Sequence, residues 1–269
     1  MARAVPSSNA SSPGIESYLR SLVIPLALPV TILVLWQSAV SLEWWPRTLI
    51  AEPLAVLAAL VRLIENGTLF VHTFVSLERY IVGFICGFVP AITLGAAIGL
   101  FKVGERAFLP TLQTLAPVPV IAWIPLLIIV FGISGARIAL ISVGTFFAIV
   151  FATFQGIRSV DYRLIELARV FEKSNHEMLL QILVPSALPN IIQATRLALA
   201  VGWILLLAGE VIASSSGLGW LIWNSRIFAR PDEMFAGMVV VGCLGALTDG
   251  LMSRLEARLQ KWRLRYEGE

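Results

Sequence analysis

The sequence predicts an all-α membrane protein with six transmembrane helices. Of its residues 58% are hydrophobic and only 14% are charged, whereas a soluble domain carries about 25% charged residues. Apolar runs long enough to cross a hydrocarbon core of about 30 Å alternate with short polar segments. The net charge of +3 needs no nucleic-acid partner, because Lys and Arg gather at the cytoplasmic ends of membrane spans.

The N-terminal region contains a polar tail and a first span. Residues 1–16 are rich in Ser, Ala and Pro, which predicts a disordered tail. The apolar run at 21–42 is too long for the core of a signal peptide and lacks a clear cleavage site, so we expect it to stay as a transmembrane helix. An amphipathic helix is predicted at 53–65, with Pro53 in its first turn.

The second expected span contains glycines that favour close helix packing, and the third contains prolines that interrupt a helix. The second, 74–101, contains Gly83-x-x-x-Gly87, and this spacing of small residues lets helices approach closely in lipid. The third, 107–131, contains four prolines and therefore cannot be an unbroken helix. Broken backbone at membrane depth survives only where protein or a water-filled cavity covers it. This segment therefore either lines a transport pathway or is a kinked helix buried in the bundle. Its pathway candidates are Pro117, Pro119, Trp123 and Pro125.

The remaining spans are expected at 136–155, 186–213 and 234–251. The fifth contains two ionisable residues, Arg196 and Glu210, which are also pathway candidates. A charge at the centre of a span costs about 2.5–3.5 kcal/mol on insertion scales, so such residues usually face a partner or a cavity. Arg196 either reaches the membrane interface or meets a carboxylate. Glu210 either gates the pathway or pairs with a basic side chain, and we favour the pairing.

Residues 161–190 form the one long polar interruption in the second half of the chain. Leu164, Ala168 and Phe171 recur at helical spacing and predict one apolar face of a short amphipathic helix. The motif from Ser174 to Glu177 is typical of a capping box that opens a second helix. Lys and Arg are more numerous on the side of this loop than on the opposite side, which places the loop and both chain termini in the cytoplasm.

This loop resembles the E-A-A…G…I-x-L-P loop of bacterial ABC importer permeases. In that family the loop forms a coupling helix that docks into a groove on a cytoplasmic ATPase. Leu167 and Glu172 stand where Ala and Gly are usual, and Glu is a costly residue at the positive φ that often ends a helix. Asn175 tolerates that conformation better and offers an alternative end one turn later. The resemblance implies these ATPase-coupling residues: Leu164, Glu166, Leu167, Ala168, Arg169, Phe171, Glu172 and Pro185.

Three further motifs resemble the same family. Ser76-Leu77-Glu78-Arg79 matches its S-L-x-R opening, while the proline-rich run at 117–126 and the turn at 214–219 resemble its nitrate, sulfonate, taurine and bicarbonate branch. The resemblance implies a type I ABC importer permease fold in the bacterial inner membrane, surrounded by lipid. It also implies a homodimer, two separate ATPase subunits that bind the ATP and Mg, and an extracytoplasmic binding protein that delivers a small anion.

Two other classes of protein compete with this interpretation. An ion- or proton-coupled secondary transporter would use Arg196, Glu210 and Asp249 as coupling charges, but the two halves of the sequence show no convincing repeat. A membrane enzyme would need a convergent catalytic set, and the sequence has neither such a set nor a metal-ligand cluster. We therefore expect no catalytic residues, no metal and no cofactor bound by this chain.

Overall fold

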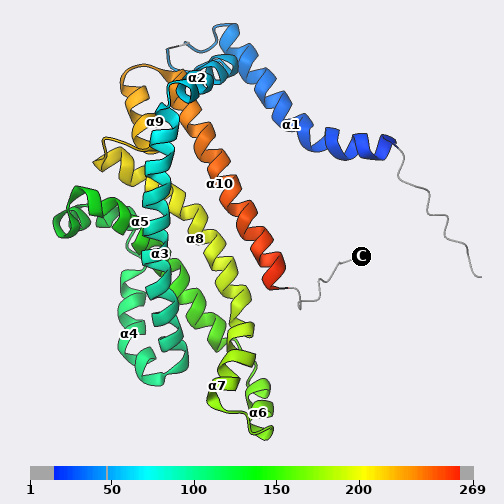
Figure 1. Ribbon diagram of the computed structural model, residues 1–269, viewed down its shortest axis with the longest axis vertical. Coiled ribbons are helices and arrows are strands. Elements are labelled where there is room, and N and C mark those ends of the chain that lie inside the picture. Colours follow the sequence, from blue (N-terminus) through cyan, green and yellow to red (C-terminus); the bar gives the residue numbers. More distant parts are fainter. Residues whose placement is uncertain (1–14, 47, 261–269) are drawn as a thin grey trace, which may run out of the picture.

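The computed structural model describes residues 15–46 and 48–260, which form helices joined by turns (Figure 1). The expected disordered tail therefore lies largely outside the described residues. The helical elements are α1 (Ile15–Ser41), α2 (Pro53–Glu65), α3 (Thr68–Leu100), α4 (Lys102–Leu115), η1 (Val120–Trp123), α5 (Ile124–Arg158), α6 (Tyr162–Val170), α7 (Asn175–Met178), a π-helical turn η2 (Leu179–Leu183), α8 (Val184–Ala213), α9 (Leu218–Ile227) and α10 (Pro231–Leu259).

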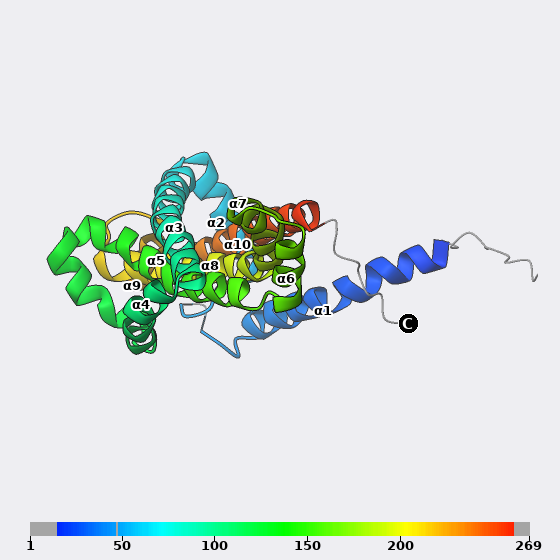
Figure 2. The ribbon, with the colours of Figure 1, turned by 90° about the horizontal axis from the view of Figure 1, so that it is seen from below.

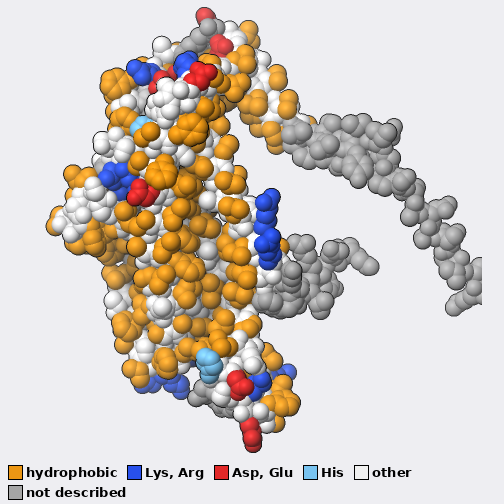
Figure 3. Space-filling view, viewed as in Figure 1, with side chains coloured by type: hydrophobic (Ala, Val, Ile, Leu, Met, Phe, Trp, Pro, Cys, Tyr) orange, Lys and Arg blue, Asp and Glu red, His pale blue; other side chains and the backbone are white. Residues whose placement is uncertain are grey.

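Among the described residues, four helical segments are long and apolar enough to cross a membrane: Thr68–Leu100, Val120–Arg158, His176–Ile212 and Pro231–Leu259. The long helices run along the long axis of the molecule, with α6 and α7 at one end and α2 and α9 at the other (Figure 1). Helix α1 leaves this bundle, as two perpendicular views show (Figures 1 and 2). Apolar side chains cover much of the surface between the ends, which suits contact with lipid (Figure 3).

The centre of the bundle is the packing of α3 against α5 and of α5 against α8. Its core contains Tyr80, Leu140, Ile141 and Leu206, all less than 9% exposed. Glycines permit the close contact of α3 with α5: a Cβ atom on Gly87 would lie 2.3 Å from the backbone carbonyl oxygen of Ser142. The close helix approach predicted from the glycine spacing is confirmed at this contact.

The chain is broken where the proline-rich third span was expected. Helix α4 ends at Leu115, Pro119 precedes the short η1 turn, and Pro125 lies in the first turn of α5. Inside α5 a second break occurs at Gly132, whose φ of 67° and ψ of 173° lie in a region that only glycine adopts readily. The prediction that this segment is not one unbroken helix is confirmed, and the path is set by Gly132 as well as by the prolines.

Candidate functional site

Helix α6 presents an apolar surface at its end of the bundle. Asp161 precedes it and accepts a hydrogen bond at 2.9 Å from the backbone N–H of Arg163 through its side chain, as an N-cap does. Leu164, Leu167 and Phe171 are 45%, 53% and 69% exposed. Ala168, predicted on the same face, is only 4% exposed, so it is buried and adds nothing to the exposed apolar surface. Large apolar side chains exposed together on a short helix are typical of a docking surface.

Two other predicted coupling residues lie on or near this helix. Glu166 is exposed, and the side chain of Arg169 lies outside the described part of the structure. The coupling role of these two residues is therefore a prediction still.

The C-terminus of α6 is formed by Glu172. Its φ of 49° is left-handed, and the backbone N–H of Lys173 donates to the carbonyl oxygen of Ala168 at 3.0 Å. This is the hydrogen bond of a Schellman motif, here with Glu instead of the usual Gly. A left-handed conformation costs a residue with a Cβ atom about 1–2 kcal/mol. The alternative helix end at Asn175 is wrong, since α6 stops one turn before it.

The capping box after α6 is confirmed. The backbone N–H of Ser174 donates to Glu177 Oε2 at 2.9 Å, and the N–H of Glu177 donates to Ser174 Oγ at 3.3 Å. From here α7, η2 and α8 follow one another without a non-helical residue between them. Pro185 lies in the first turn of α8, directly after η2. Proline lacks an N–H and crowds the carbonyl group four residues earlier. The wider π-helical turn before Pro185 relieves this crowding.

The expected pathway prolines, Pro117, Pro119 and Pro125, are exposed in the described chain. Trp123 is half-buried, and its indole Nε1 is a buried donor without a hydrogen-bond partner in residues 15–46 and 48–260. A lone buried indole N–H is uncommon, because the donor loses its water without gaining an acceptor.

Arg196 meets carboxylates, one of the two alternatives considered for it. Its Nε and Nη2 donate to Asp249 of α10, the shortest contact being 2.7 Å, and its Nη1 donates to Glu256 at 3.1 Å. Arg196 is 12 residues from the start of α8, about 18 Å along the helix. A cavity of about 240 Å³ lies beside the pair and is lined partly by Trp203 and Thr248.

Glu210 is fully buried and pairs with Arg79 of α3. Pairing with a basic side chain is the alternative favoured for Glu210 from the sequence. Arg79 Nη1 donates to Glu210 Oε1 at 2.8 Å, and Ser76 Oγ donates to the same carboxylate at 2.8 Å. The backbone N–H of Gly219 donates to Oε2 at 2.8 Å. The carboxylate thus joins α3, α8 and α9.

The same network holds the turn at 214–217. Arg79 also donates to the Ser216 carbonyl oxygen at 2.8 Å, and the N–H of Gly217 donates to His72 Nδ1 at 3.0 Å. A Cβ atom on Gly217 would lie 2.1 Å from the nearer Glu210 oxygen, and its φ of 109° also requires glycine. The sequence analysis missed His72 and the pairing role of Arg79. A signal was present: His72, Ser76 and Arg79 recur at i, i+4 and i+7, a polar stripe on an apolar helix.

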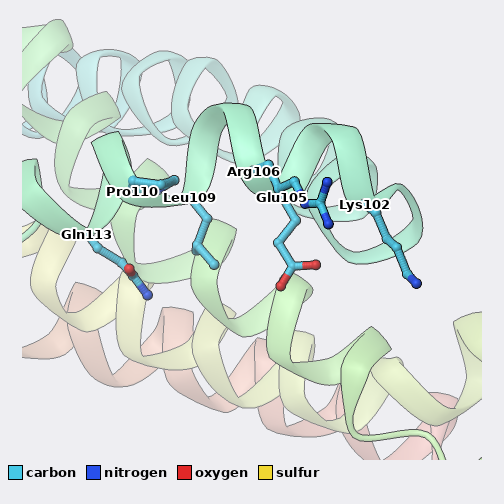
Figure 4. A pocket seen from close by; sticks show the side chains of 6 residues that line it. All are labelled: Lys102, Glu105, Arg106, Leu109, Pro110 and Gln113. Atoms are coloured by element: carbon cyan, nitrogen blue, oxygen red, sulfur yellow. The ribbon is translucent and has the colours of Figure 1, made fainter.

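Charged residues also lie where α4 begins, near the α6 end of the bundle. Lys102, Glu105 and Arg106 extend from one stretch of α4 (Figure 4) and line a cavity of about 430 Å³. Glu105 forms an ion pair with Arg158 at the end of α5. Both side chains are partly exposed, so this pair contributes little stability. Among the residues that the structure describes, no group of three or more His, Cys, Asp or Glu is placed to hold a metal ion.

Long apolar helices, a buried ion pair and an exposed amphipathic helix at one end fit the membrane subunit of a transporter. A family model described as "Binding-protein-dependent transport system inner membrane component" matches residues 87–261, and the chain belongs to this family. It is a multi-pass inner-membrane permease of an ATP-driven importer and not an enzyme. In this family an ATPase and a binding protein are partners, and ATP and Mg belong to the ATPase.

Curated relatives cover almost the full chain. A protein of Bacillus subtilis described as an aliphatic sulfonates transport permease is 38% identical, over 90% of this chain and 88% of its own length. The corresponding Escherichia coli protein is 36% identical, over 91% and 93%. The taurine transport system permease of E. coli is 28% identical, over 90% of each chain. A chain of the inward-facing MetNI methionine ABC transporter covers 69% of this chain and 93% of its own, with a TM-score of 0.60 and 19% identity, which shows the shared fold alone.

Proposed function

We propose that α6 is the coupling helix of this permease and that Leu164, Leu167 and Phe171 insert into a groove of the ATPase partner. The observation that carries this proposal is their joint exposure on a helix with defined caps at both ends. Burying a Leu or Phe side chain contributes about 1.5–3 kcal/mol, so three of them supply a strong anchor. Glu166 and Arg169 would orient the dock, while the buried Ala168 would support the surface from beneath.

The connection from α6 to the membrane domain suits the transmission of motion. The Schellman motif and the capping box fix the turn after α6, and the helical run from α7 through α8 then leads directly into the bundle. A displacement of α6 by ATP-driven closure of the ATPase subunits would therefore move α8 as a lever. This is the rigid-body motion that alternating access requires.

A second copy of the chain would complete the pathway between two bundles, with the loop at 161–190 and both termini in the cytoplasm. The broken segment that contains Pro117, Pro119, Trp123 and Pro125 is our candidate for the pathway lining, because irregular backbone at membrane depth needs protein or a water-filled cavity around it. Arg196 and Glu210 are held in ion pairs, which supports a structural role for both.

The solute that we propose is a small anion of the sulfonate type, delivered by an extracytoplasmic binding protein. Relatives described as permeases for aliphatic sulfonates, taurine and bicarbonate support this class, and nitrate belongs to the same chemistry. An aliphatic sulfonate is our preferred solute, since the two most similar of these relatives carry that description.

Purification of the tagged chain from native membranes tests the proposal. We expect a stoichiometric ATPase to copurify, to be lost when Leu164 and Phe171 are both changed to Asp, and to drive uptake of a sulfonate into liposomes. Glu177→Gln is a control for the loop, because it weakens the capping box without touching the apolar surface. A chain that purifies alone and transports under a proton gradient would instead be a secondary transporter.

A further inference from the structure

Three charged side chains meet near the end of the bundle opposite α6, and their charges do not balance. Glu210 is paired with Arg79 at 2.8 Å. Arg137 of α5 lies in the same network but forms no ion pair within the described residues. Two guanidinium groups therefore lie near one carboxylate that is ion-paired with Arg79 alone, and the cluster keeps a net charge of about +1.

Within the described part of the chain, the hydrogen bonds of Arg137 are with hydroxyl groups. The residue is 9% exposed, its Nη1 donates to Ser214 Oγ at 2.5 Å, and its Nη2 donates to Ser134 Oγ at 3.1 Å. Its Nε is buried and has no hydrogen-bond partner among the residues that the structure describes. Ser214 Oγ also accepts a hydrogen bond from Arg79 Nη1 at 3.2 Å, so two cations converge on one hydroxyl.

This arrangement is costly for folding. A buried charge is stabilised only when it is paired, and serine hydroxyls contribute dipoles but no neutralising charge. An apolar residue at position 137 would avoid the cost. An ionic group retained in a membrane protein with no ion pair among the described residues is a candidate for function.

The chemistry of the cluster fits an oxyanion. A guanidinium group presents several donors in one plane and matches carboxylate-like and phosphate-like oxygens, and serine hydroxyls can rotate to donate to the same group. The net positive charge of the Arg79, Arg137 and Glu210 cluster disfavours a cation as its ligand. The Glu210–Arg79 pair holds the 214–217 turn, and so sets the position of Ser214 opposite Arg137.

The location of Arg137 suits a role in the pathway. It lies 21 residues before the end of α5, about 32 Å along the helix, and Arg79 lies the same distance from the end of α3. It also follows the break at Gly132 by five residues. The cluster is thus far from α6 and next to the broken segment that we assign to the pathway.

We propose that Arg137, with Ser134 and Ser214, binds the anionic group of the transported solute at the extracytoplasmic end of the pathway. This inference rests on the proposed function and deepens it, because it assigns a residue to solute selection. In the present conformation Arg137 of α5 is buried and hydrogen-bonded to Ser214, so the solute reaches it when the 214–217 turn separates from α5 on outward opening.

The test uses the complete importer in liposomes, with labelled ethanesulfonate and taurine as probes. Arg137→Met is expected to lower ATP-driven uptake at least tenfold, and Arg137→Lys to retain part of it, since lysine keeps the charge. In detergent, the thermal unfolding temperature of Arg137→Met should equal or exceed that of the wild type, because an uncompensated buried charge is removed. Ethanesulfonate should raise the unfolding temperature of the wild type, at constant ionic strength, and not that of Arg137→Met.

Two control variants separate binding from structure. Arg79→Met removes the partner of Glu210 and should lower the unfolding temperature. Ser215→Ala changes the exposed neighbour of Ser214 and should leave uptake unchanged. Normal uptake by Arg137→Met, or instability of Arg137→Met like that of Arg79→Met, would overturn the inference. A wild-type complex without ATP-driven uptake of either probe would overturn the proposed function itself.

Discussion

Removal of the Glu210 carboxylate should destabilise the protein strongly. The carboxylate accepts hydrogen bonds from Ser76, Arg79 and Gly219, and it is fully buried. In Glu210→Ala all three donors lose their acceptor, and the Arg79 side chain, only 13% exposed, keeps an unpaired charge. Breaking a buried ion pair by removing one partner costs about 3–5 kcal/mol, and we expect a loss in that range.

Denaturant unfolding of the purified permease in detergent measures this loss. The matched control is Asp232→Ala, because Asp232 pairs with Arg62 at 2.6 Å but the Arg62 side chain is 57% exposed. An exposed pair contributes about 0–1 kcal/mol. The double variant Arg79→Met with Glu210→Leu removes both charges and should recover about half of the loss or more. A loss for Glu210→Ala no larger than for the control would refute the reasoning.

Three further predictions address α6 and the helix contacts. Changing Leu164 or Phe171 alone to Asp should weaken copurification with the ATPase and lower uptake, while the unfolding temperature of the permease stays near the wild-type value; a wild-type yield of ATPase would contradict the docking role. Glu172→Gly should raise stability by about 1 kcal/mol, because glycine adopts the left-handed conformation without strain, and a lower unfolding temperature would count against this helix end. Gly87→Leu should separate α3 from α5 and reduce the yield of folded protein. The control Gly242→Leu should be tolerated, because a Cβ atom at position 242 meets nothing within 4 Å. Equal yields of the two variants would exclude the close contact as a determinant of folding.

Much of the loop could be predicted from sequence because its determinants are local. The capping box joins Ser174 to Glu177 within one helical turn, and the apolar surface of α6 follows from residues three and four positions apart. The burial of Ala168 could not be predicted, since periodicity defines a face but not what covers it. The conformation of Glu172 was unexpected for its residue type, and the hydrogen bond from Lys173 to Ala168 accompanies it.

The broken third span is another case in which the sequence predicts local structure but not the tertiary arrangement. Prolines at 117, 119 and 125 show where a helix cannot continue, because each removes a donor and clashes with the preceding turn. They do not indicate where the chain goes next. That path depends on the conformation of Gly132 and on packing against residues far away in sequence.

The sequence by itself determined the membrane class, the apolar helices, the small-residue contact of α3 and the capped polar loop, because these depend on composition and on neighbours within about one helical turn. Only the tertiary structure decided which charges meet. Arg79 and Glu210 are 131 residues apart in the sequence. They form an ion pair because the packing of the helices brings this part of α3 next to this part of α8. Arg137 of α5 lies in the same network but forms no ion pair with a carboxylate of the described residues. A buried charge must find its counter-charge in space, and packing alone sets which groups come within reach.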